Sequence, residues 1–189
     1  GQLSLGTGGF MATGAFAAYK LATSFPEMNI IIVFLLAGVI TAGIGVLFGL
    51  PSLRIKGFYL AVATLASQFF LVWLYNKLPW FTNYSSSGVI SAPPRAVFGD
   101  FFVTGASASP QAKYLFALAF VCVLALVAKN IVRSHIGRGW MAIRDMDIAA
   151  EIIGIKPLQT KLSAFAVSSF YCGIAGALWD FIYTSSVEA

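Results

Sequence analysis

The sequence predicts an all-α fold: a polytopic bundle of about five transmembrane helices, with a short amphipathic helix on its cytoplasmic side. Of the 189 residues, 59% are hydrophobic and only 10% are charged, and the mean hydropathy is +0.85. Soluble domains carry about 25% charged residues, so this chain has too few to cover a surface in water. Its apolar residues also come in long uninterrupted runs. These observations exclude an ordinary soluble enzyme, a disordered segment and a coiled coil, and they indicate that lipid surrounds the chain.

Five segments are apolar enough to be membrane spans, because a spanning helix needs about 20 mostly apolar residues. In chain order they are residues 3–22, 28–50, 57–76, 114–132 and 162–179. The first is the least hydrophobic and contains Gly6, Gly8, Gly9 and Gly14. Small residues let membrane helices approach closely, so we expect this helix to pack tightly against its neighbours.

The basic residues predict how the bundle is oriented. In a soluble protein the net charge of +5 could indicate nucleic-acid binding, but in a membrane protein the positions of the charges carry the information. Eight of the 12 basic residues fall in or beside two alternate connections: Arg54, Lys56, Lys129, Arg133, Arg138, Arg144, Lys156 and Lys161. The positive-inside rule therefore places the N-terminus, residues 54–56 and the loop 133–161 in the cytoplasm, and the loop 77–113 outside.

The chain lacks the usual signatures of catalysis and energy coupling. No ionisable residue lies near the middle of the four strongest spans, and Asp180, at the end of the last span, is expected to reach water. The sequence contains no P-loop motif, so ATP hydrolysis by this chain is not expected. His135 has no cysteine or second histidine near it, so no metal site or cofactor is predicted. Cys122 and Cys172 are expected to be small buried side chains, with a disulfide or metal pair as the alternative.

The loop between the last two spans carries the strongest local pattern. Residues 140–154 have helical periodicity, and Gly154 followed by Pro157 predicts where the helix ends. One predicted face is apolar and consists of Ile143, Met146, Ala150 and Ile153; another is charged and consists of Arg144, Asp147 and Glu151. Such a helix could lie on the membrane surface or in the groove of a partner protein. Because acid and base are mixed on the polar face, the pattern favours a protein partner.

These residues carry a family resemblance. Ala149-Ala150, followed after three residues by Gly154, resembles the EAA loop of ABC importer permeases. The stretches GRGWMAIRDMDIAAEIIGI and KLSAFAVSSFYCGIAGALW resemble the branched-chain amino acid permease family. GQLSLGTGGFMATGAFAAY and LRIKGFYLAVATLA agree with the LivM-type branch of that family. The blocks occur in the family's order and cover most of the chain outside residues 77–113.

The resemblance implies a subunit of a binding-protein-dependent importer in the bacterial inner membrane. A second homologous permease, two cytoplasmic ATPase subunits that use the ATP, and an external solute-binding protein are the implied partners. The implied ATPase-coupling residues are Ala149, Ala150 and Gly154, flanked by Arg144, Asp147 and Glu151. The chain departs from the EAA consensus at Ile148, where the consensus has glutamate, which puts the acidic contact in doubt. Permeases of this type extend beyond both ends of this sequence, so residues 1–189 are expected to be one permease domain that forms part of a larger bundle.

The path of the substrate is less clearly marked. Thr64, Ser67 and Gln68, with the glycines of 6–9 and 43–49, could line it, but helix packing and interhelical hydrogen bonds explain the same residues. The resemblance implies branched-chain amino acids as the substrate. Importers of urea and short-chain amides use similar permeases and remain an alternative. A non-transporting membrane scaffold and an ion-coupled carrier are the other readings, and the outer segment 84–94 is one candidate for binding-protein docking.

Overall fold

The computed structural model describes residues 4–52, 58–80, 90–92, 109–184 and 186–187. The helices are α1 (Thr7–Ser24), α2 (Ile30–Ser52), α3 (Phe58–Lys77), α4 (Pro110–Arg133), α5 (His135–Asp145), α6 (Asp147–Ile152) and α7 (Pro157–Leu178). A π-helical turn (Trp179–Thr184) continues α7, and β1 (Ile90–Ser91) pairs antiparallel with β2 (Ser186–Val187). The predicted all-α fold is confirmed for the described residues, since a long helix coincides with each of the five predicted apolar segments.

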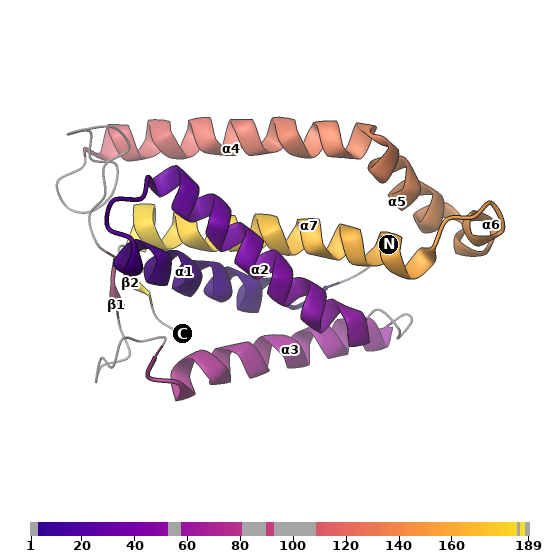
Figure 1. Cartoon of the computed structure of the whole chain (residues 1–189), viewed down its shortest axis with the longest axis horizontal. Helices are drawn as coiled ribbons and strands as arrows, with labels where there is room; N and C mark the ends of the chain where they lie inside the picture. Colours follow the sequence, from indigo (N-terminus) through magenta and orange to yellow (C-terminus); the bar gives the residue numbers. More distant parts are fainter. Residues whose placement is uncertain (1–3, 53–57, 81–89, 93–108, 185, 188–189) are drawn as a thin grey trace.

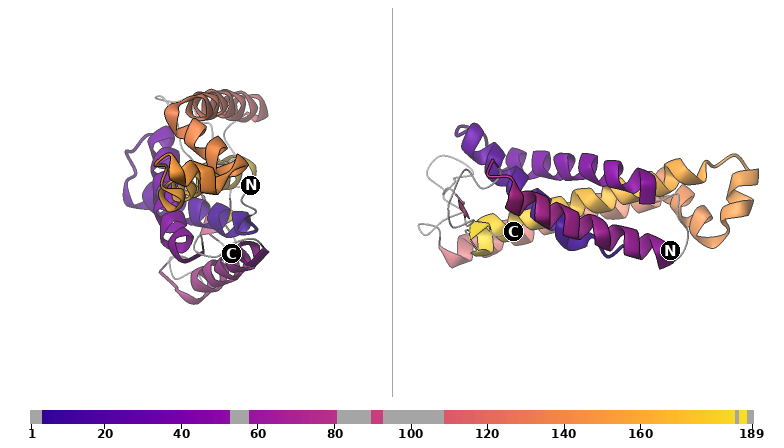
Figure 2. Two further views of the ribbon diagram at one scale, coloured as in Figure 1. Left: turned by 90° about the vertical axis from the view of Figure 1, so that its right-hand side faces the viewer. Right: turned by 90° about the horizontal axis from the view of Figure 1, so that it is seen from below.

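The long helices run along one bundle axis, and its two ends differ (Figure 1). At one end α2 stops and α3 begins, and α5 and α6 project beyond the bundle there, as Figure 2 also shows. At the other end lie the α1–α2 connection, the β1–β2 pair and the turn after α7. Successive long helices therefore run in alternate directions along the bundle, as the distribution of basic residues predicts. Residues 54–56 and most of the predicted outer loop 77–113 lie outside the described residues.

The centre of the bundle is built on small residues where α1, α2 and α7 cross. A Cβ atom at Gly14 would collide with the backbone of Gly173, and one at Gly176 would collide with the backbone of Met11. On α2, Thr41 lies in the same way against Gly173. The absence of side chains at these positions lets the backbones approach, which confirms the close packing predicted for the glycine-rich first helix.

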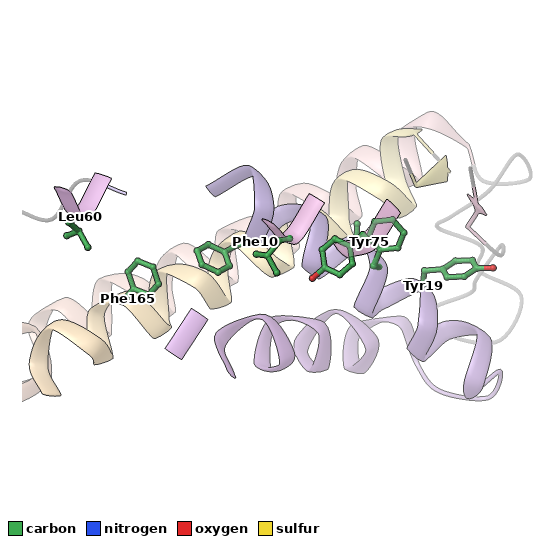
Figure 3. Packing of buried hydrophobic residues seen from close by; sticks show 8 residues of the cluster. Phe10, Tyr19, Leu60, Tyr75 and Phe165 are labelled. Atoms are coloured by element: carbon green, nitrogen blue, oxygen red, sulfur yellow. The ribbon is translucent and has the colours of Figure 1, made fainter. Parts of the chain in front are cut away.

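Two apolar clusters flank this crossing. The first joins α1, α3 and α7, and Figure 3 shows its labelled members Phe10, Tyr19, Leu60, Tyr75 and Phe165. The second consists of Ala18, Ala22, Ile30, Val33, Phe34, Ala37, Ala177 and Phe181. In the second cluster the ring of Phe34 contacts Phe120 of α4 and Phe181 of the π-helical turn, with centroids 5.9 and 5.7 Å apart. The aromatic contacts therefore attach α4 to the bundle.

Three helical segments are long and apolar enough to cross a membrane, judged by length and composition alone. They are Ile30–Pro51, Pro110–Arg133 and Pro157–Thr184. Among the described residues, helices α1 and α3 are not included in this set. Helix α1 is less apolar because it is rich in glycine and threonine and contains Lys20. Of the 24 residues of α4, none is buried. Cys122 on α4 is accordingly exposed, so the expectation that both cysteines are buried was wrong; Cys172 is half-buried, and both are free thiols.

Candidate functional site

The loop predicted to couple to other proteins contains two helices instead of one. Helix α5 ends at Asp145, and Met146 adopts an extended conformation, with φ −151° and ψ 96°, before α6 begins. The single helix predicted over 140–154 was therefore wrong. Asp147 occupies the first turn of α6, where a negative charge interacts favourably with the partial positive charge of a helix N-terminus. This preference helps a new helix to start one residue after the old one ends.

Gly154 ends α6 as the sequence predicted. Its φ is +92°, a left-handed conformation that costs a residue with a Cβ atom more than it costs glycine. The Gly154 N–H donates to the Glu151 carbonyl and the Ile155 N–H donates to the Ala150 carbonyl, both at 3.0 Å. These two bonds form a Schellman motif, and Pro157 then starts α7.

The break at Met146 divides the predicted apolar face. Ile143 and Ala150 are buried, whereas Met146 and Ile153 point away from the protein. Among the predicted coupling residues, Ala150 is buried and Asp147 is half-buried; Arg144, Ala149, Glu151 and Gly154 are exposed. The loop thus presents most of the predicted residues on its surface, but not as one continuous helical face.

The loop carries an exposed apolar surface, of which the sequence pattern included Met146 and Ile153 but not Ile148 and Ile152. It consists of Met146, Ile148, Ile152 and Ile153, whose side chains are 70–81% exposed. We call these four residues the loop apolar surface. Four large apolar side chains with this exposure on one short segment are a candidate interaction site. The signal in the sequence was Ile148 itself, which stands where the EAA consensus has a glutamate.

Two side-chain contacts attach the loop to α7. The Trp140 indole Nε1–H donates to Ser163 Oγ at 2.9 Å, and the Ser163 hydroxyl donates in turn to the Thr160 carbonyl at 2.8 Å. Lys161 Nζ lies 4.0 Å from Asp147 Oδ2. The first contact holds α5 and the second holds α6 against the beginning of α7. Side chains of both loop helices therefore join the loop to the beginning of α7.

Arg144 pairs with its neighbour in the chain. Its Nε donates to Asp145 Oδ1 at 2.8 Å, and this hydrogen bond raises the pKa of the Arg144 guanidinium. Both side chains are more than 60% exposed, so water screens the interaction and its contribution to stability is small. The guanidinium retains other N–H groups that can donate to a partner.

The residues predicted to line a substrate path lie in or beside the contact between α1 and α3. Thr64 Oγ1 accepts a hydrogen bond from the Leu5 N–H at 3.0 Å and donates to the Ala61 carbonyl at 2.9 Å. Ser67 Oγ donates to the carbonyl of Ala63 at 2.9 Å. The side chain of Gln68 packs on the glycines at the start of α1. Thr64 and Gln68 thus pack against the start of α1, whereas the Ser67 bond stays within α3. The role of the three residues in a path stays a prediction.

Residues 1–188 match the family of permease components of branched-chain amino acid transport systems. The chain belongs to this family. It is 31% identical over 200 residues to the high-affinity branched-chain amino acid transport system permease protein LivM of Salmonella typhimurium and 30% identical to LivM of Escherichia coli. Each match covers 95% of this chain and 46% of the relative, so the chain spans about half the length of these permeases. No solved structure matches it.

Family membership confirms the resemblance read from the loop and the glycine-rich stretches. A permease component is the membrane part of a transport system and not a catalytic subunit. The roles of the six predicted coupling residues and of Thr64, Ser67 and Gln68 remain predictions.

One residue of this permease lies in a different environment from the one that the sequence predicts. Asp180, expected to reach water, is only 2% exposed. Neither of its carboxylate oxygens has a hydrogen-bond partner among the described residues. The cause is the π-helical turn, which keeps this segment folded against the bundle after α7 has ended. An acid directly between Trp179 and Phe181 in an apolar run was the signal that the sequence offered.

Proposed function

We propose that this chain is part of the permease subunit of an ATP-driven, binding-protein-dependent importer of branched-chain amino acids in the bacterial inner membrane. The observation that carries the proposal is the family match over residues 1–188. Two relatives that bear the name of a branched-chain amino acid permease support the substrate class. The proposed partners are a second homologous permease, two cytoplasmic ATPase subunits and an external solute-binding protein.

All five long helices cross the membrane in this proposal, including α1 and α3. Helix α1 has 18 residues and rises about 27 Å at 1.5 Å per residue, close to the thickness of the hydrocarbon core. Half of its residues are buried against neighbouring helices, so Gly9, Thr13 and Gly14 are shielded from lipid. The buried residues are Gly9, Phe10, Thr13, Gly14, Ala15, Phe16, Ala18, Tyr19 and Ala22. An inner helix needs less hydrophobicity than one that faces lipid on most sides, as α4 does.

The ATPase subunits bind the loop between α4 and α7. The loop apolar surface enters an apolar groove of the ATPase, and Arg144 and Glu151 make polar contacts at its edge. Ala149 is small enough to let α6 approach closely, and Gly154 fixes the turn that presents it. This mode of binding, an amphipathic helix in a groove, is common in recognition between proteins.

Closure of the ATPases moves the loop, and α7 carries the movement into the bundle. The Trp140–Ser163 hydrogen bond and the Asp147–Lys161 pair lie where the loop meets this helix. The bundle then alternates between outward-open and inward-open states. Separation of α1 from α3 would free Thr64 and Gln68 from their packing contacts and let them line the path together with Ser67.

Replacing Gly154 tests this mechanism. We expect Gly154→Val to be strained at φ +92°, at a cost of about 1–2 kcal/mol for a residue with a side chain, and to displace the end of α6. In the complete complex in liposomes, stimulation of ATP hydrolysis by the loaded binding protein should fall. Gly139→Ala is the matched control, because its added Cβ would make an ordinary contact with Thr160 at 3.6 Å. Equal stimulation in the two variants would contradict the proposed role of the loop.

Two further measurements separate the alternatives. A permease should co-purify with a second permease and two ATPase chains, whereas a scaffold should not. Uptake of leucine compared with uptake of urea distinguishes an amino acid importer from a urea or amide importer.

A further inference from the structure

The buried acid at the end of α7 has no evident structural role. The buried polar side chains of the described residues are Thr13, Thr41, Thr64, Ser169 and Asp180. Each of the four hydroxyl groups donates to a backbone carbonyl of its own helix. Asp180 is the exception, since both of its oxygens are buried without a partner among the described residues. A buried carboxylate without hydrogen bonds costs several kcal/mol, so an acid retained there needs a compensating group.

The backbone around Asp180 is also unusual. The helix changes from α to π geometry at Trp179, one residue before the acid. π-helical turns are rare and frequently occur at functional sites. Asp180 lies three residues after Ala177 and directly before Phe181, and both of these side chains are fully buried in the second apolar cluster. The acid thus belongs to the helix face that packs on α1 and α2.

A cationic N–H donor is the group that would compensate an ionised carboxylate at this position. An ionised carboxylate only accepts hydrogen bonds. The two ion pairs within the described ranges, Arg144–Asp145 and Lys161–Asp147, lie in or beside the loop at the other end of the bundle. A metal ion does not fit, because no group of three potential ligands occurs among the described residues and hard cations take six or more oxygen ligands. A single carboxylate in apolar surroundings matches an organic ammonium, which charge-assisted hydrogen bonds hold well.

We propose that Asp180 binds the α-ammonium group of the amino acid during transport. The inference rests on the proposed function, which supplies a substrate with an ammonium group and an apolar side chain. In the arrangement described here the carboxylate is closed off, so the substrate reaches it when the ends of the helices opposite the loop separate. Binding then stabilises that open state by providing the partner that the acid lacks in the closed one.

The test uses the complete importer in liposomes, with L-leucine as the probe, and the variants Asp180→Asn and Asp180→Glu. We expect D180N to lower leucine uptake by about ten- to a hundredfold, the effect of losing one hydrogen bond to a charged group. D180E keeps the charge and should retain more uptake than D180N. The Tm of the substrate-free D180N complex should equal or exceed that of the wild type, because the substitution removes an uncompensated charge. Glu27→Gln, an exposed acid in the α1–α2 connection at the same end, should change neither quantity.

Three results would overturn the inference. Wild-type uptake by D180N would mean that the carboxyl group has no charged role. A lower Tm for D180N that D180E restores would assign the partner to a lysine or arginine of the protein instead of the substrate. Loss of assembly by D180N that D180E restores would have the same meaning, because the charge would then be needed without the substrate. Failure of D180E equal to that of D180N would show that size and not charge matters. Failure of the wild-type complex to take up leucine would instead refute the proposed function, and the Tm comparison would still report on the charge.

Discussion

Removing the loop apolar surface should weaken ATPase binding without unfolding the permease. We choose Ile148→Ala and Ile152→Ala because these side chains are 73% and 81% exposed, so neither contributes much to the fold. Alanine also has the highest helix propensity, which preserves α6. Any loss of binding would then report the contact with the partner.

The size of the effect follows from the exposed area. Each substitution removes three side-chain carbons, worth about 0.8 kcal/mol each when buried. Scaled by the exposed fractions, the loss is about 2 kcal/mol for either residue if docking buries it completely. The Kd for the ATPase subunit should therefore rise about 20- to 30-fold for each single variant and about 500-fold for the double variant.

The assay is a titration of purified ATPase subunit into the detergent-solubilised pair of permeases. Leu115→Ala is the control, since Leu115 is 62% exposed near the start of α4 and loses a similar apolar area. We expect the control to bind the ATPase as the wild type does. If the double variant binds within about threefold of the control, the ATPase does not dock on this surface and the reasoning from exposure is wrong.

Two other variants test the packing and the connection to α7. Gly14→Ala should lower the Tm of the solubilised permease, at a cost of about 1–3 kcal/mol, because the new Cβ collides with the backbone of Gly173. Gly43→Ala is its control, since nothing lies within 4 Å of a Cβ there; similar Tm values for both would contradict the tight crossing. Trp140→Phe removes the donor to Ser163, worth about 0.5–1.5 kcal/mol, and should lower the amount of substrate transported per ATP hydrolysed. Ser163→Ala should have the same effect, and the double variant should add little to either; fully additive effects would show that the two residues act separately.

The parts of the fold that depend on local sequence could be predicted. Each apolar segment of about 20 residues became a helix, because the pattern of hydrophobicity along the chain is enough to specify it. The end of α6 was also predictable, since the left-handed conformation at Gly154 favours glycine over every other residue. The glycines of the first helix predicted a close contact, but not that Gly173 of α7 would be the partner.

The features that depend on distant contacts could not be predicted. The helical periodicity of the sequence continues through Met146, so it does not predict the break between α5 and α6 there. The two helices are instead held by different residues of α7, Ser163 and Lys161. Likewise, Asp180 lies at the end of an apolar run, where an acid usually reaches water. Its burial follows from the π-helical turn and from the packing of Phe181 on Phe34 of α2, which no local pattern specifies.

Helix α7 connects the two proposed sites. Its beginning carries Lys161 and Ser163, which hold the loop, and the turn at its end carries Asp180. The 17 residue steps from Ser163 to Asp180 rise about 26 Å at 1.5 Å each, most of the thickness of the hydrocarbon core. Between these ends α7 crosses α1 at Gly173 and Gly176, where backbone lies against backbone. On the two proposals, ATP binding at one end of this helix therefore controls when the carboxylate at the other end is open to the substrate.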